Sequence, residues 1–154
     1  FINALRVERN VMFLILTLII LVAAFNIISS MIMLVRSKNG DIAVLRTMGA
    51  SSGAVMRVFL MTGSSIGLVG TAAGTFLGLL FSWKISSIQG FIERISGADL
   101  FAAEIYFLST LPAKVDPGEV GLVIAMALGL SFLASLYPAW RAARIAPAEA
   151  LRYE

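Results

Sequence analysis

The stretch VMFLILTLIILVAAFNIISSMIMLV runs from Val11 to Val35 without one charged residue. As an α-helix with a rise of about 1.5 Å per residue, it reaches roughly 37 Å. This length exceeds the hydrocarbon core of a bilayer, which is about 30 Å thick. Residues 11–35 are therefore predicted to cross a membrane as a helix.

Two further uncharged runs have the same character. Val58 to Trp83, entered through residues 54–56, predicts a second span over 54–83, and Val120 to Trp140 predicts a third over 120–140. The whole chain is 59% hydrophobic and 14% charged, whereas soluble domains carry about 25% charged residues. The sequence predicts an all-α membrane protein with three transmembrane helices.

The charged residues between the runs predict how the spans are oriented, because lysine and arginine accumulate on the cytoplasmic side. The connection over 36–53, the start of the second span and the tail over 141–154 are basic, with Arg36, Lys38, Arg46, Arg57, Arg141, Arg144 and Arg152. The loop over 84–119 carries five acidic residues and three basic ones. The connection and the tail are therefore predicted to be cytoplasmic and the loop to lie outside.

Residues 1–10 then begin outside, either as a helical stalk that continues the first span or as a frayed end. The sequence starts at Phe1 and shows no signal-peptide pattern. We expect it to be a piece of a longer chain.

Several chemistries find no residues to support them. The chain has no cysteine and no histidine, so thiol nucleophiles, imidazole bases and Cys/His metal sites are excluded. Gly63 to Gly67 matches the G-x-S-x-G pattern of serine hydrolases, but Ser65 has no histidine base. No phosphate-binding G-x-x-x-x-G-K-[ST] loop occurs, and the basic residues form no nucleic-acid-binding stripe. We expect no catalytic or metal site, no cofactor in this chain and no nucleic-acid partner.

A row of glycines marks one face of the second span. The members recur at intervals of three and four: Gly63, Gly67, Gly70, Gly74 and Gly78. Small residues at this spacing allow another helix to approach closely. The row predicts either a static packing seam or a surface along which helices slide.

Asn26, Ser29 and Ser30 form a polar patch within the first span. An unpaired amide in hydrocarbon is costly, so the patch should face protein or water. An interhelical hydrogen bond is the favoured interpretation, and a substrate contact is the alternative.

The connection between the first two spans is predicted to contain a short helix. Asn39 or Asp41 can cap its start, and Gly49 can take the left-handed position that closes it. Ile42, Leu45 and Met48 are predicted to share a face, and Ser51 can cap the next helix. This short helix could rest on the membrane surface or be the element through which a cytoplasmic motor moves the spans.

The tail leaves the third span near Pro138. Pro147 suits the first turn of a short final helix, with Glu149 near its positive end. The alternative is a charged membrane stop with no further role.

Three stretches resemble a known family: Asn3 to Val35, Asp41 to Ser51 and Tyr137 to Glu154. They look like the permease subunits of lipoprotein-releasing ABC transporters (LolC/LolE type) of Gram-negative inner membranes, within the wider FtsX/MacB-like permeases. Such permeases have four spans and a periplasmic domain between the first two. The chain, residues 1–154, thus resembles the last three spans.

The resemblance implies that Asp41 to Gly49 is a coupling helix that docks on a separate ATPase subunit, which would bind ATP and Mg. The residues expected to carry this coupling are Asp41, Ile42, Leu45, Arg46, Met48 and Gly49. ATP hydrolysis there would drive extraction of a lipoprotein, which a periplasmic chaperone receives through a domain absent from these residues.

The resemblance also implies a second permease copy or paralogue and contact with membrane lipid. Phe13, Leu16, Ile20 and Asn26 are the candidates for the lipoprotein cavity. Two alternatives remain open: a MacB-like or FtsX-like subunit that transmits force, and a membrane anchor without transport.

Overall fold

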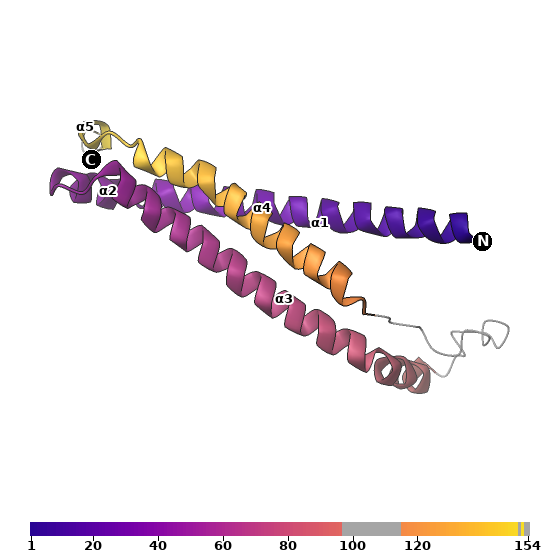
Figure 1. Cartoon of the computed structure of the whole chain (residues 1–154). Helices are drawn as coiled ribbons and strands as arrows, with labels where there is room; N and C mark the ends of the chain where they lie inside the picture. The colour runs from indigo at the N-terminus through magenta and orange to yellow at the C-terminus, as the bar shows by residue number, and fades with distance from the viewer. Residues whose placement is uncertain (97–114, 151, 153–154) are drawn as a thin grey trace. The chain divides into compact units, whose positions relative to one another are not determined.

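The computed structural model describes residues 1–96, 115–150 and 152, and the regular structure in these residues is helical (Figure 1). The helices are α1 (Ile2–Ser37), α2 (Asn39–Thr47), α3 (Ser52–Ser96), α4 (Pro117–Ala143) and α5 (Pro147–Ala150). The expected breaks at Gly97 and Pro112 lie outside the described residues.

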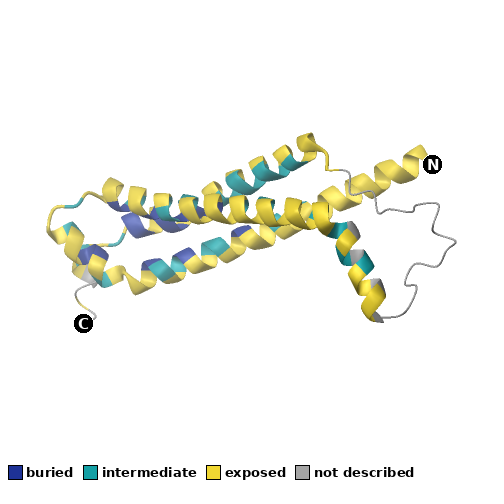
Figure 2. Cartoon of the chain, turned by 90° about the horizontal axis from the view of Figure 1, so that it is seen from below, coloured by how far each residue is buried: buried dark blue, intermediate teal, exposed yellow. Residues whose placement is uncertain are grey.

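Three of these helices are long and apolar enough to cross a membrane: Ile2–Ser37, Ser52–Ile85 and Pro117–Ala143. Most of their side chains are exposed, as the yellow surfaces of Figure 2 show. A bilayer core satisfies no backbone group, so helices with all hydrogen bonds inside the segment are the structure expected there. The predicted fold class, all-α with three transmembrane helices, is confirmed.

The spans differ from their predicted bounds mainly by extension. α1 begins at Ile2, so residues 1–10 are helical and continuous with the first span. α3 runs on to Ser96, so the segment from Ile88 to Ile95 continues α3 and is not the separate interfacial helix that the sequence suggested. α4 starts at Pro117, where Asp116 Oδ1 accepts a hydrogen bond from Gly118 N at 2.8 Å, and it continues through Pro138 to Ala143.

The chain divides into two compact units. The first comprises Phe1–Val69 and Ala125–Glu154, and so contains α1, α2, the first part of α3, most of α4 and α5. The second, Gly70–Ile124, holds the rest of α3 and the start of α4. In it the Thr75 hydroxyl donates to Thr71 O at 2.7 Å, so this polar group is satisfied within its own helix.

The core of the first unit lies where the ends of its helices meet α2. Its buried members come from four helices: Met31, Val35, Ile42, Val55, Phe59, Ala139 and Ala142. Alanines at 139 and 142 are fully buried, and their small side chains let α4 approach closely. The same end of the unit therefore ties all three spans to α2.

α3 and α4 cross at very short range within the first unit. A Cβ on Gly67 would lie 2.5 Å from Ser131 Cβ and 2.9 Å from its hydroxyl, and one on Gly63 would overlap Ser135 Cβ. The Ser135 hydroxyl donates instead to Phe132 O of its own helix at 2.7 Å. By contrast, a Cβ at Gly70, Gly74 or Gly78 meets no described atom within 4 Å. The predicted glycine row thus divides: its first two members lie at the crossing.

Replacing Gly67 by alanine should push α3 and α4 apart, because the added methyl occupies the space of the Ser131 side chain. We expect a loss of about 1–3 kcal/mol in the free energy of unfolding, typical of overpacking, measured by SDS-induced unfolding of the detergent-solubilised protein. Gly74→Ala is the matched control and should be neutral or slightly stabilising. Equal effects of the two changes would contradict the close crossing.

Candidate functional site

α2 follows α1 almost without interruption. Lys38 alone separates them, and the backbone ladder continues through it, with Lys38 N donating to Leu34 O at 3.0 Å and Ile42 N donating to Lys38 O at 2.9 Å. The expected side-chain cap by Asn39 or Asp41 was therefore wrong: Lys38 occupies the cap position, and no side-chain hydrogen bond forms there. Few backbone donors are left unpaired, so a cap is not needed.

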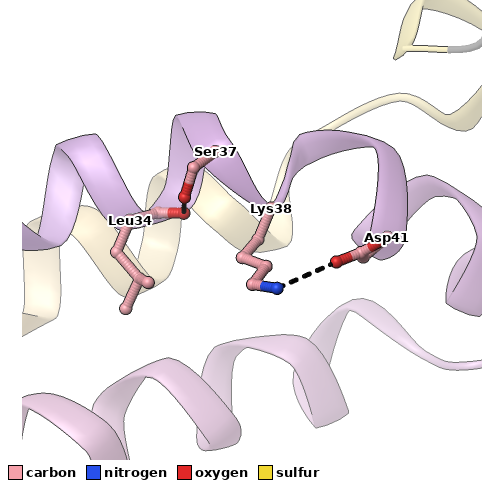
Figure 3. A network of polar contacts seen from close by, with 4 residues as sticks. All are labelled: Leu34, Ser37, Lys38 and Asp41. Atoms are coloured by element: carbon pink, nitrogen blue, oxygen red, sulfur yellow. Dashed lines mark hydrogen bonds and ion pairs between the residues drawn. The ribbon is translucent and has the colours of Figure 1, made fainter.

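Asp41 has another partner, the exposed ammonium of Lys38, whose Nζ lies 3.2 Å from Asp41 Oδ2 (Figure 3). The same view shows the Ser37 hydroxyl donating to Leu34 O at 2.9 Å. An exposed ion pair of this kind contributes little to stability. It does hold Asp41 beside the turn that separates α1 from α2.

The end of α2 agrees with the sequence prediction. Gly49 has a φ of +106°, where non-glycine residues are strained. This conformation lets Gly49 N reach Arg46 O at 3.2 Å and Ala50 N reach Leu45 O at 3.0 Å. Ser51 then caps α3, because its hydroxyl accepts from Ala54 N at 3.2 Å. Gly49 and Ser51 together set the reversal between α2 and α3.

The two faces of α2 differ sharply in exposure. Ile42 and Ala43 are 3% and 0% exposed, whereas Leu45 is 53% and Met48 79% exposed. The prediction that Ile42, Leu45 and Met48 share a face was therefore wrong, since the core draws Ile42 inward and leaves the other two outside. With the half-exposed Val44, Leu45 and Met48 form an exposed apolar surface, here called the α2 patch.

Arg46 joins α2 to the end of the last span. Its Nη1 donates to Ala143 O at 3.1 Å and to Ile145 O at 2.7 Å. The final carbonyls of a helix have no partner within the helix and carry partial negative charge, so a guanidinium suits them well. The side chain is partly buried at this position. Arg46 thus fixes α2 against α4 and the segment that follows it.

The segment after α4 lies close to this junction. Ile145 packs on the core of the first unit, and the Arg144 guanidinium stacks 4.2 Å from the centroid of the Trp140 ring. Pro147 opens α5, as predicted from its fixed φ. The tail is therefore a folded part of this site.

The four candidates for a lipoprotein cavity do not gather around one. Phe13, Leu16 and Asn26 are exposed along α1, and Ile20 is intermediate. An apolar pocket of about 230 Å³ does lie between α1 and α4, lined by residues such as Leu21, Phe25, Leu130 and Leu133. None of the four candidates lines it. Sequence reasoning missed this pocket, because pocket residues on an apolar helix look like any others.

The described residues, 1–96, 115–150 and 152, contain no group of His, Cys, Asp or Glu side chains that could hold a metal ion. The Ser65 hydroxyl, which matched a hydrolase pattern, donates to Thr62 O at 2.8 Å. This bond satisfies the hydroxyl within its own helix. The arrangement is suited to mechanical contact and gives no support to covalent chemistry at Ser65.

Three membrane helices and a short outer helix bound to the last of them define a multi-pass membrane domain. The sequence profile of the FtsX-like permease C-terminal family matches residues 13–147, and the chain belongs to this family. It is 47% identical to the lipoprotein-releasing system transmembrane protein LolC of Neisseria meningitidis and to that of Xylella fastidiosa, each over 152 residues. It is 40% identical over 148 residues to the protein LolE of Haemophilus influenzae.

These matches cover almost the whole chain but a minor part of the relatives. The two LolC comparisons span 99% of the chain and 37% of each relative, and the LolE comparison spans 96% and 35%. The chain thus corresponds to little more than a third of the curated relatives that it matches.

The Arg46 contact predicts a specific effect of Arg46→Ala. Loss of two hydrogen bonds from a charged donor, worth about 1.5–3 kcal/mol, should loosen the segment after Ala143. We expect trypsin to cleave after Arg144 roughly tenfold to a hundredfold faster under native conditions, as measured by mass spectrometry. Arg57→Ala removes an exposed arginine and should leave the rate at Arg144 unchanged. Identical rates in all three proteins would show that Arg46 does not hold the tail.

Proposed function

We propose that the chain is the membrane portion of a permease subunit in an ATP-driven ABC transporter that releases lipoproteins from the inner membrane of a Gram-negative bacterium. The support is its identity of up to 47% to LolC and LolE, whose names place them in a lipoprotein-releasing system. A purely structural anchor would explain neither this similarity nor the exposed α2 patch. In this proposal the chain is not an enzyme, and a separate ATPase subunit binds ATP and Mg.

The observation that carries the proposal is the geometry of α2. Its outer side presents Leu45 and Met48, while its inner side and Arg46 bind it to the ends of the spans. A docked ATPase would therefore contact Val44, Leu45 and Met48. Ile42, Arg46 and Gly49 would act as positioning residues, since they fix where the α2 patch lies.

This arrangement gives a route for force. α2 shares one core with α1, α3 and α4, and close-packed cores transmit displacement instead of absorbing it. When the ATPase subunits close on ATP, a push on the α2 patch would move the attached ends of all three spans. Movement of the spans would extract a lipoprotein from the outer leaflet and pass it to a periplasmic chaperone through the domain that precedes these residues.

The proposal includes an orientation. The basic connection and tail place α2 and α5 in the cytoplasm, and the acidic loop over 84–119 and the start of α1 in the periplasm. Arg46 connects α2 with the segment after α4, which agrees with both lying on one side.

Single cysteines test this proposal, because the chain has none of its own. In the full-length permease, Thr47→Cys places a thiol on the exposed side of α2, beside the patch. We expect it to crosslink to single-cysteine variants of the ATPase subunit, with a yield that changes on addition of ATP.

Trp83→Cys is the control, at an exposed position near the far end of the second span. It should give no crosslink to the ATPase and should react with a membrane-impermeant maleimide added from the periplasmic side. If Thr47→Cys labels readily from the cytoplasm but never crosslinks, α2 is not the docking element and the proposed function fails.

A further inference from the structure

Asn26 is the exception among the polar residues of the spans. Thr17, Thr62, Ser65, Thr75 and Ser135 each donate to a carbonyl of their own helix. The Asn26 side chain is exposed, and within the described part of the chain no residue forms a hydrogen bond with its amide. A lipid tail offers such an amide no partner, so the face that bears it requires another polar surface.

This face of α1 points away from the rest of the first unit. The buried residues of α1 are Ala24, Met31 and Val35, and the positions opposite them follow a spacing of four and three. This row, here called the α1 seam, consists of exposed residues: Ile15, Ile19, Val22, Asn26, Ser29 and Met33. Alternate steps of three and four place residues along one line of a helix that packs against a nearly parallel partner.

From these observations we infer that the α1 seam binds the α1 seam of a second copy of this chain. Apolar residues at such spacing would suit lipid equally well, so the argument depends on Asn26. An amide carries both a donor and an acceptor, and a two-fold axis places identical residues face to face. The carbonyl of one Asn26 then accepts from the amide of the other at the same depth in the membrane.

The dimensions and the shapes of the side chains fit a helix pair. From Ile15 to Met33 the seam rises roughly 27 Å, close to the ~30 Å of the hydrocarbon core. Ile15 and Val22 occupy equivalent positions one heptad apart, where β-branched residues favour two strands. Ser29 occupies the next equivalent position and permits close approach beside the amide pair.

The contact rests on the proposed function only in taking the partner to be a second permease subunit. Its test therefore leaves the ATPase out. Full-length permease copies with two different epitope tags are co-expressed, each with the same single cysteine, and native membranes are oxidised with copper phenanthroline. Val22→Cys on the seam is compared with its neighbour Leu21→Cys, which is also exposed but lies on another face at nearly the same depth. Ile15→Cys and Leu14→Cys form a second matched pair.

We expect Val22→Cys and Ile15→Cys to yield disulfide-linked dimers that carry both tags, at least fivefold more than Leu21→Cys and Leu14→Cys. Adding Asn26→Leu to Val22→Cys should lower the yield several-fold, because the register loses its hydrogen bonds. Equal yields on the two faces, no dimer from any variant, or adducts only with a different protein would overturn the inference. These outcomes leave the Thr47→Cys result untouched, so failure of this contact and failure of the proposed function can be told apart.

Discussion

Hydrocarbon offers no hydrogen bonds, and the arrangement of this molecule follows from how each polar group meets that constraint. Along the spans, hydroxyl groups bond to their own helices, as the Thr17 hydroxyl does to Phe13 O at 2.8 Å. These residues add no polar surface to their neighbours. The backbone groups left unpaired at a helix end require partners from elsewhere, and Arg46 supplies two bonds to the carbonyls that end α4. Asn26 stands apart because no described residue satisfies it.

Arg46 gives the short helix a role that its sequence alone does not reveal. An arginine beside exposed apolar residues reads as part of a contact surface, and in the structure its guanidinium instead reaches back to Ala143 and Ile145. The α2 patch is therefore carried by a helix that is anchored on its inner side. A partner bound to Leu45 and Met48 would act on the ends of several spans through one small and tightly packed core.

Local features were predictable from the sequence, and contacts between distant segments were not. The spans follow from runs without charge, and Gly49 and Ser51 fulfil roles that depend only on adjacent residues. The cap at Asn39 or Asp41 was predicted wrongly because the ladder of α1 continues through Lys38. The face of α2 was predicted wrongly because burial of Ile42 depends on residues such as Val55 and Ala139, far away in the chain. Likewise, the glycine spacing indicated close packing but could not show that Gly63 and Gly67 face serines.

The crossing of α3 and α4 has a consequence for motion. Gly67 faces Ser131 almost without a gap, yet the Ser135 hydroxyl nearby is committed to Phe132 O. Among the described residues, no printed side-chain hydrogen bond runs from one of these two helices to the other at this crossing. Shear along the crossing would therefore break no such bond, and friction between the two helices would come from the shapes of their side chains alone.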